Sequence, residues 1–434
     1  MQCICRKTTN SLQEITRALL TYSSEYEHCA ILSSSGFADP EYGKYDILAA
    51  FGAKAIIRLE TEIVSFDAFR QFCETNPGWK FGYLTYDLKN DTEKLISENQ
   101  DSVGMPALCF LVPEVVIELK NDEISISGST EQVERASKSL TKHLSPNDLE
   151  RIQPKGSLTA IQTRITSAEY IDALNAIQKH IRFGDIYEMN FCQEFYINDI
   201  VINSESLFYS LNQLSPAPFS AFLKFPGHRV MCSSPERYLQ KTGTRLISQP
   251  IKGTIRRGET EAKDNALRIS LMGSEKNRSE NVMIVDLVRN DLSRTAEKGS
   301  VKVEELSGAY SFPYVHHLIS TISAELRSDM HWVDAIKHSF PMGSMTGAPK
   351  ISAMKIIEKY ESAKRGLFSG SIGYITPESD FDFNVVIRSF LYNTETKYLS
   401  FMAGGAITAG SDPNDEYEES CLKVKGLIKS LSDI

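Results

Sequence analysis

The spacing of apolar residues changes abruptly near the middle of the chain. Apolar side chains first recur at the period of an amphipathic helix, at Tyr170, Ile171, Leu174, Ile177 and Ile181. Ser167 can cap the start of this helix, and Gly184 can end it. From 187 to 192 apolar and polar residues alternate, which predicts a strand that carries Glu188 on its polar face.

The part of the chain before this helix has a strand-rich pattern. Short runs at 81–87 and 108–119 are dominated by aromatic and β-branched residues and are bounded by Pro, Gly and Asn, which predicts strands. The polar stretch 145–157 contains two prolines and a glycine, so it is the best candidate boundary. We therefore expect a smaller N-terminal domain over 1–150 and a larger domain over 158–434.

Composition narrows the class of protein. A chain of 434 residues that is 41% hydrophobic and 24% charged can bury a large core. A net charge of −9 without a Lys/Arg block argues against a nucleic-acid partner. No long apolar run or secretion signal is present, so we expect no membrane partner and a cytoplasmic location. The eight cysteines lack a paired spacing, which predicts free thiols without a zinc site.

Two polar residues of the second half are candidates for catalysis. Glu236 follows Pro235, which fixes the local backbone, and it could act as a general acid or lie in a solvated turn. Lys252 lies beside Gly253, which permits close approach of a ligand, and Thr254, which offers a hydroxyl. A lysine is nucleophilic only when neutral, and a neighbouring carboxylate would raise its pKa. The pattern leaves a surface lysine in a turn as the alternative.

Carboxylates also line two predicted helices. The segment 280–291 is helical by period and places Glu280 on an apolar stripe. Near the C-terminus, Glu416, Glu419 and Lys423 fall on one helical face. Carboxylates from two helices would suit Mg²⁺, which prefers oxygen ligands and keeps several waters. A surface ion-pair stripe is the alternative for either helix alone.

Glycine-rich segments at 343–350 and 403–407 expose backbone N–H groups that can bind a carboxylate or phosphate. The spacing of an ATP-binding P-loop is absent from the first of them. Arg388 could hold a substrate carboxylate with two hydrogen bonds, or it could be a surface group at the end of a strand.

In this order, the motifs resemble the chorismate-utilising enzymes, the family of anthranilate, aminodeoxychorismate, isochorismate and salicylate synthases. The resemblance covers roughly 165–427, and residues 82–87 extend it more loosely to the N-terminal part. It is carried by Gly-Asp-Ile-Tyr at 184–187, Ser-Pro-Glu-Arg at 234–237, Pro-Ile-Lys-Gly-Thr at 250–254, Met-Ile-Val-Asp-Leu at 283–287 with Arg-Asn-Asp at 289–291, and Gly-Ala-Pro-Lys at 347–350.

The resemblance implies an α+β fold like that of anthranilate synthase component I, with two stacked, mainly antiparallel β-sheets flanked by helices. Chorismate and Mg²⁺ would bind between the sheets. Anthranilate synthases typically have Ala where Lys252 stands, whereas aminodeoxychorismate synthase component I has Lys in this motif. The resemblance therefore implies amination at C4 of chorismate, toward p-aminobenzoate and folate. Anthranilate synthase component I is the alternative, followed by isochorismate or salicylate synthase.

The resemblance also implies roles for individual residues. Lys252 would attack C2 of chorismate while Glu236 protonates the departing C4 hydroxyl, and ammonia would then displace the lysine. His317 matches an active-site histidine, whereas His316 is expected to be a bystander. Glu280 and Glu419 would hold Mg²⁺, with Glu416 acting through water. The residues that would bind substrate are Gly253, Thr254, Ser344, Thr346, Arg388, Gly404, Gly405 and Lys423.

Two features of the sequence depart from the family's pattern or leave it incomplete. Amine-forming members usually have Gln where this chain has Glu188, so Glu188→Gln is expected to leave amination largely intact. The chain carries no amidotransferase motif. The expected source of ammonia is therefore a separate glutamine amidotransferase subunit.

Overall fold

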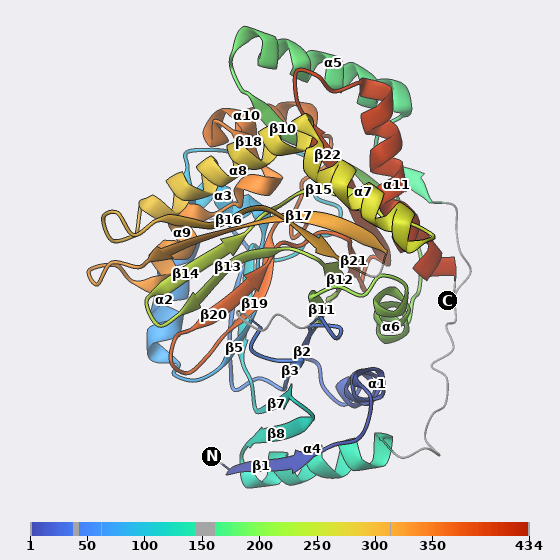
Figure 1. The fold of residues 1–434 in the computed structure, drawn as a ribbon. Helices are drawn as coiled ribbons and strands as arrows, with labels where there is room; N and C mark the ends of the chain where they lie inside the picture. Colours follow the sequence, from blue (N-terminus) through green and yellow to red (C-terminus); the bar gives the residue numbers. More distant parts are fainter. Residues whose placement is uncertain (1, 38–42, 62, 145–160, 313, 433–434) are drawn as a thin grey trace.

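The computed structural model describes residues 2–37, 43–61, 63–144, 161–312 and 314–432. Two large β-sheets form the centre of the molecule, and helices lie around them (Figure 1). Every pair of named strands in the described ranges is antiparallel. The predicted α+β fold with two antiparallel sheets is therefore confirmed.

The first sheet has twelve strands. Their spatial order is β1 (Gln2–Lys7), β8 (Glu123–Gly128), β7 (Val115–Lys120), β3 (Ile47–Phe51), β2 (Cys29–Ser33), β11 (Phe219–Phe225), β12 (His228–Ser234), β21 (Ser389–Asn393), β22 (Tyr398–Ile407), β10 (Glu188–Ile197) and β18 (Gly347–Ala348), with β9 (Gln162–Thr163) beside β10.

The second sheet has ten strands. Their order is β15 (Ile251–Arg256), β17 (Val315–Glu325), β14 (Arg245–Gln249), β13 (Arg237–Thr242), β20 (Phe381–Asn384), β19 (Ser371–Ile375), β5 (Lys80–Leu84), β6 (Leu108–Val112) and β4 (Ala55–Leu59), with β16 (Lys302–Ser311) beside β17.

The helices lie around these sheets, and most of them pack through apolar faces. They are α1 (Leu12–Ser23), α2 (Ser65–Thr75), α3 (Lys89–Thr92), α4 (Thr130–His143), α5 (Ser167–Phe183), α6 (Ser204–Leu214), α7 (Glu261–Gly273), α8 (Glu275–Ser293), α9 (Trp332–Ser339), α10 (Lys350–Tyr360) and α11 (Pro413–Ser432), with short 3₁₀ turns at Tyr86–Leu88 and Gly343–Met345.

Both sheets combine strands from the two parts of the chain. Strand β2 pairs with β11 in the first sheet, and β5 pairs with β19 in the second. The core between the sheets is shared in the same way, since the ring of Tyr83 packs against that of Phe225 at 5.7 Å between centroids. The predicted domains 1–150 and 158–434 thus share both sheets, while the predicted boundary at 145–157 lies outside the described residues.

The predicted helix and strand after residue 166 are present, with two differences. Helix α5 is capped by Thr166, not by Ser167, because Thr166 and Glu169 form a reciprocal capping box. Gly184 ends the helix with φ of 85°, as predicted. Strand β10 follows, but its polar residues are buried as well as its apolar ones. Met189 and Phe191 pack with α5 and α10, whereas Glu188 faces the second sheet.

Pattern reading was also correct for the segments that carry the acidic residues. The segment 280–291 lies within α8, and the C-terminal carboxylates lie on α11. The run 108–119 holds two strands, β6 and β7. Within the described residues, the longest apolar stretches of helix fall short of what crossing a lipid bilayer requires.

Candidate active site

Lys252 lies near the start of β15, next to an irregularity in the pairing of β15 with β17. Gly253 has φ of +90°, and a Cβ there would lie 3.1 Å from Asn277 Cγ, so glycine fits this position best. Asn281 Nδ2 donates a hydrogen bond of 2.9 Å to the carbonyl oxygen of Lys252. Helix α8 thus fixes the backbone of Lys252 on β15.

The lysine side chain bridges the two sheets. Lys252 Nζ on β15 donates a 2.7 Å hydrogen bond to Glu188 Oε1 on β10. The two side chains are only 8% and 1% exposed. Burial, the largest influence, would lower the pKa of Lys252, but the charges of Glu188, Glu280 and Glu236 raise it above its usual value. The surface-turn interpretation is therefore wrong, and the amine is held as an ammonium.

Glu236 is buried in the turn between β12 and β13. Burial raises the pKa of Glu236 to about 7, although hydrogen bonds from Ser344 and the N–H of Ile251, and the charge of Lys252, act to lower it. A carboxyl group with this pKa is partly protonated near neutral pH, as a general acid requires. The alternative of a solvated turn residue is excluded.

Glu280 supplies a buried carboxylate from α8. Its Oε1 is buried without a hydrogen-bond partner in the described part of the chain, and burial raises the pKa of this group. Glu416 is also buried and accepts hydrogen bonds from Ser411 at 2.8 Å and Lys276 at 3.4 Å. The charges of Glu188, Lys276 and Glu416 all act on Glu280. These groups therefore form one cluster of charges.

Glu419 lies at the edge of this cluster. It forms an i, i+4 ion pair with Lys423 at 2.8 Å, and the two side chains are 50% and 42% exposed. Burial acts to raise the pKa of Glu419, but the charges of Lys423, Lys276 and Lys252 lower it by more, so the net shift is downward. The predicted ion-pair stripe is thus present at this pair, beside the buried carboxylates.

The carboxylates are compatible with Mg²⁺. Among the described residues, no group of three His, Cys, Asp or Glu side chains is arranged to hold a metal. Mg²⁺ usually takes only one or two protein carboxylates and keeps its waters, so such a group is not required. The unpartnered buried oxygen of Glu280 is the feature that a cation would satisfy.

His317 and Thr254 lie opposite one another on β17 and β15. The Oγ1 of Thr254 is 2.8 Å from His317 Nδ1, and the buried Nε2 has no partner among the described residues. Burial lowers the pKa of His317 to about 3, and the charge of Arg388 acts in the same direction. The imidazole is therefore neutral, with Nε2 free for a ligand. His316 contacts Ser311 and Asp264 instead, as expected for a bystander.

Arg388 offers a partly buried positive charge. Burial lowers the pKa of its guanidinium, and no hydrogen bond or ion pair of this group is present among the described residues. A partly buried guanidinium without a protein partner can form two hydrogen bonds to a carboxylate of a ligand. Arg388 therefore fits its predicted role as a partner for a substrate carboxylate.

The glycine-rich segments contribute unequally. Ser344 contacts Glu236, but the hydroxyl of Thr346 donates within its own turn, to the carbonyl oxygens of Met342 and Gly343 at 3.2 Å. The hydroxyl of Thr346 thus bonds within its own turn, and none of its hydrogen bonds in the described part of the chain reaches another candidate residue. A Cβ on Gly404 would lie 2.0 Å from the Phe191 carbonyl, so this glycine permits close strand pairing.

Gly405 faces the acidic cluster. A Cβ there would lie 2.9 Å from Glu416 Oε2 and 3.8 Å from Lys423 Nζ. Lys423 Nζ also donates to the carbonyl oxygen of Gly404 at 2.7 Å. The second glycine-rich segment is therefore next to the predicted metal and substrate residues of α11.

Sequence reasoning missed two sets of residues. Lys276 lies one helical turn before Glu280. Burial, the largest influence, would lower the pKa of Lys276, but the charges of Glu416, Glu280 and Glu419 raise it above the usual value. Its spacing from Glu280 was the only signal. Arg365 is fully buried, pairs with Glu361, and donates to the carbonyl oxygens of Met345 at 2.7 Å and Asn190 at 3.0 Å. It joins the 343–346 turn to β10.

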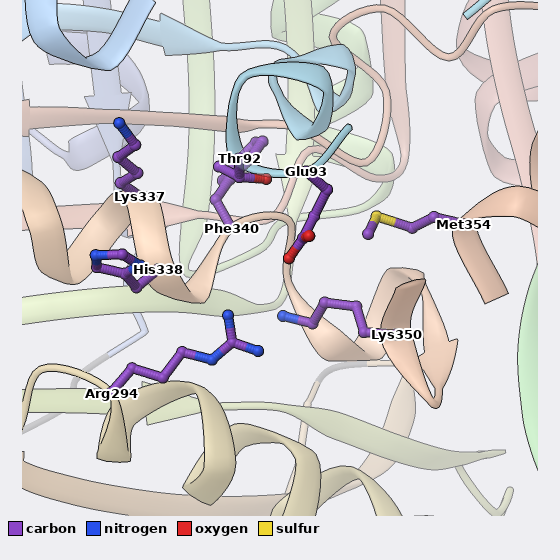
Figure 2. Close-up of a pocket in the computed structure, with 8 residues that line it drawn as sticks. All are labelled: Thr92, Glu93, Arg294, Lys337, His338, Phe340, Lys350 and Met354. Atoms are coloured by element: carbon purple, nitrogen blue, oxygen red, sulfur yellow. The ribbon is translucent and has the colours of Figure 1, made fainter. Parts of the chain in front are cut away.

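Lys350, the lysine of the 347–350 motif, lines a separate pocket. Figure 2 shows Glu93 pointing between Arg294 and Lys350 in this pocket. Lys350 Nζ pairs with Asp291 at 2.5 Å and donates to the Ser339 carbonyl at 3.1 Å. The lysine of the 347–350 motif therefore ties the start of α10 to α8 and α9. The lining residues are Thr92, Glu93, Arg294, Lys337, His338, Phe340, Lys350 and Met354.

The model of the chorismate binding enzyme family matches residues 28–429. This chain belongs to the chorismate binding enzymes. The residues around Lys252, from both sheets, lie within the matched range.

Comparison with individual chorismate binding enzymes agrees with this family assignment. The chain is 32% identical to aminodeoxychorismate synthase component 1 of Escherichia coli, over 94% of this chain and 95% of that protein. It is 31% identical to anthranilate synthase component 1 of Aquifex aeolicus, over 82% and 74%. The crystal structure of anthranilate synthase component I from Streptococcus pneumoniae superposes with a TM-score of 0.77 at 24% identity, over 90% and 93%, and so shares the fold.

Proposed function

We propose that this chain aminates chorismate at C4, with ammonia from a glutamine amidotransferase subunit, and forms 4-amino-4-deoxychorismate through a covalent adduct on Lys252. The observation that carries the proposal is the position of Lys252, buried between the sheets beside Glu236 and the acidic cluster. The similarity to aminodeoxychorismate synthase component 1 of E. coli over nearly the whole chain supports it.

The residues can divide one difficult substitution into two easier ones. In the first step the amine of Lys252 attacks C2, both conjugated ring double bonds shift by one position toward C4, and the C4 hydroxyl leaves as water with a proton from Glu236. In the second step ammonia attacks C4, both double bonds shift back, and the bond between C2 and Lys252 breaks. Two displacements give overall retention, which a single frontal attack would not readily give.

The other polar groups bind and orient the substrate. Arg388 has an unpaired charge for one carboxylate, and neutral His317 presents Nε2 beside it. Glu280 and Glu419, with Glu416 through water, would hold Mg²⁺. The ion would supply Lewis-acid stabilisation of the substrate's ring carboxylate.

The test is to incubate the chain with chorismate, Mg²⁺, ammonium and an excess of aminodeoxychorismate lyase, and to identify the product by mass and retention time. We expect p-aminobenzoate from the unaltered chain and none above background from Lys252→Ala. Ammonium salts replace the amidotransferase subunit in this assay.

Anthranilate formed without the lyase would contradict the proposal. It would support amination at C2, the alternative favoured by the 31% identity to anthranilate synthase component 1 of A. aeolicus. In that case Lys252→Ala should retain activity, because C2 amination does not need the lysine as a nucleophile.

A further inference from the structure

We propose that Glu188 takes the proton from Lys252 when the lysine attacks the substrate, and returns it when the lysine leaves. Glu188 would therefore act as the general base toward the nucleophile. The inference rests on the proposed C4 amination and adds a residue whose part in it the sequence left open.

The contact between the two groups is specific. Glu188 Oε1 is 2.7 Å from Lys252 Nζ, a hydrogen-bond distance at which a proton can pass directly. Glu188 is the only residue in the described part of the chain with a hydrogen bond to Nζ. The other oxygen, Oε2, is buried without a partner there. Glu188 therefore has one oxygen bonded to the amine and one oxygen without a partner in the described residues when it accepts the proton.

The backbone around Glu188 fixes this contact. Glu188 pairs with Ala348 of β18, and a Cβ on the neighbouring Gly347 would lie 2.2 Å from the Glu188 carbonyl oxygen. Close packing of these two strands sets where the carboxylate enters the space between the sheets. Lys252 is set independently by Gly253 and Asn281 on the other side.

Charged groups from four elements face the lysine. They are Glu188 from β10, Glu236 from the turn before β13, Glu280 from α8 and Glu419 from α11. Glu236 is occupied as the acid that protonates the leaving hydroxyl, and Glu280 and Glu419 are proposed for Mg²⁺. Glu188 has no other assigned task, and among the residues that the structure describes it alone has a hydrogen bond to the amine.

The protons balance over the two steps. Lys252 begins as an ammonium and gives one proton to Glu188, the bond between N and C2 forms, and the C4 hydroxyl leaves as water with the proton of Glu236. When ammonia forms its bond to C4, the bond between C2 and the lysine breaks and the amine departs neutral. Glu188 then returns its proton to Lys252, while Glu236 takes one from the new C4 ammonium.

A carboxylate can do this where an amide cannot. Gln at position 188 could still accept a hydrogen bond from Lys252, but it could not hold a proton near neutral pH. Transfer inside a buried pair also leaves the net charge of the site unchanged, which avoids moving a charge through a poorly solvated space. The sequence predicts that Glu188→Gln is tolerated, whereas the ion pair leads us to expect a loss.

The experiment isolates the lysine step by omitting ammonia. The unaltered chain, Glu188→Gln and Glu188→Asp are mixed with chorismate and Mg²⁺, and the adduct of chorismate minus water on Lys252 is timed by intact-protein mass spectrometry. The rate of each variant is divided by the rate of the unaltered chain at the same pH. Titrations that affect both proteins equally cancel in this ratio. We expect Glu188→Gln to be slower by about 10²-fold near neutral pH, the size of a lost proton transfer.

The decisive readout is the pH dependence of that ratio. Glu188→Gln must release the proton of Lys252 to solvent, so its disadvantage should shrink as the pH rises, and Glu188→Asp should regain part of the rate. Glu194→Gln is the matched control, because Glu194 is also buried on β10 in an ion pair, with Arg164 at 2.9 Å. It should form the adduct at the normal rate.

An equal rate and pH dependence in Glu188→Gln and the unaltered chain would overturn the inference, and so would a constant ratio at all pH values, which indicates a structural defect. Failure of the proposed function looks different. In that case the unaltered chain itself forms no adduct and yields a product other than p-aminobenzoate in the lyase assay.

Discussion

At the scale of single residues, the same burial has opposite effects on the three central groups. It raises the pKa of Glu236 to about 7 and lowers that of His317 to about 3. For Lys252, burial would act downward, but three carboxylates outweigh it. The site therefore holds a protonatable acid, a neutral imidazole and a charged lysine within one poorly solvated space.

The pKa of Glu236 leads to a prediction about pH. As the proposed general acid, Glu236 would support adduct formation only when protonated, below its pKa of about 7, and this support would be lost as the pH rises through that value. We expect Glu236→Gln to lose about 10²-fold or more in rate, since an amide cannot donate this proton. The measurement is the rate of adduct formation without ammonia, as a function of pH.

Ser344→Ala is the companion variant for this test. The hydrogen bond from Ser344 lowers the pKa of Glu236, so its removal should move the descending limb of the profile to higher pH. An unchanged limb in both variants would assign the titration to another group.

At the scale of elements, buried charges outside the site hold its parts in place. Arg365 and Glu361, both 1% exposed, form an ion pair near the end of α10. Glu361 accepts a hydrogen bond from the N–H of Cys192 at 2.9 Å, and Arg365 donates to the Met345 carbonyl. This pair links α10, β10 and the turn that carries Ser344.

Removing one partner of this pair should destabilise the fold. We expect Arg365→Ala to lower the free energy of unfolding by about 3–5 kcal/mol, because Glu361 is left buried and unpaired. Urea unfolding at neutral pH, followed by circular dichroism, is the measurement.

Arg289→Ala serves as the comparison on α8. The pair of Arg289 with Asp286 spans 2.9 Å, but its side chains are 50% and 76% exposed, so its loss should cost less than about 1 kcal/mol. Equal unfolding curves for the two variants would argue against the proposed bracing role of Arg365.

At the scale of the whole molecule, the N-terminal and C-terminal parts complete each other's sheets. Strand β11 has β2 on one side, and β19 has β5 on one side. Separating the parts would expose those strand edges and the core between Tyr83 and Phe225.

We therefore expect residues 161–434, expressed alone, to lack a cooperative thermal transition. The control is the full chain with a protease recognition site introduced into 145–160. After cleavage, the two fragments are kept together, and they should retain the thermal transition because both sheets remain paired. Circular dichroism with temperature measures both. A cooperative transition of the isolated fragment, together with chorismate binding, would show that the two parts fold independently.

The sequence alone determined the features that depend on local spacing. The helical period and Gly184 predicted α5, although the cap fell on Thr166, because Ser and Thr are both favoured caps and only the backbone selects between neighbours. The ordered motifs predicted the family, the fold class and the candidate residues Lys252, Glu236 and Glu280.

Tertiary structure decided the contacts between residues far apart in the chain. The pairing of Glu188 with Lys252 joins two sheets over a separation of 64 residues, and no local pattern encodes it. The role of Lys276 likewise depends on α11 lying beside α8. Strand pairing between the two parts is also non-local. The predicted boundary in the sequence therefore gave no indication that strands from both parts share each sheet. Local spacing specifies elements, whereas the charges that set each pKa are brought together only when those elements pack.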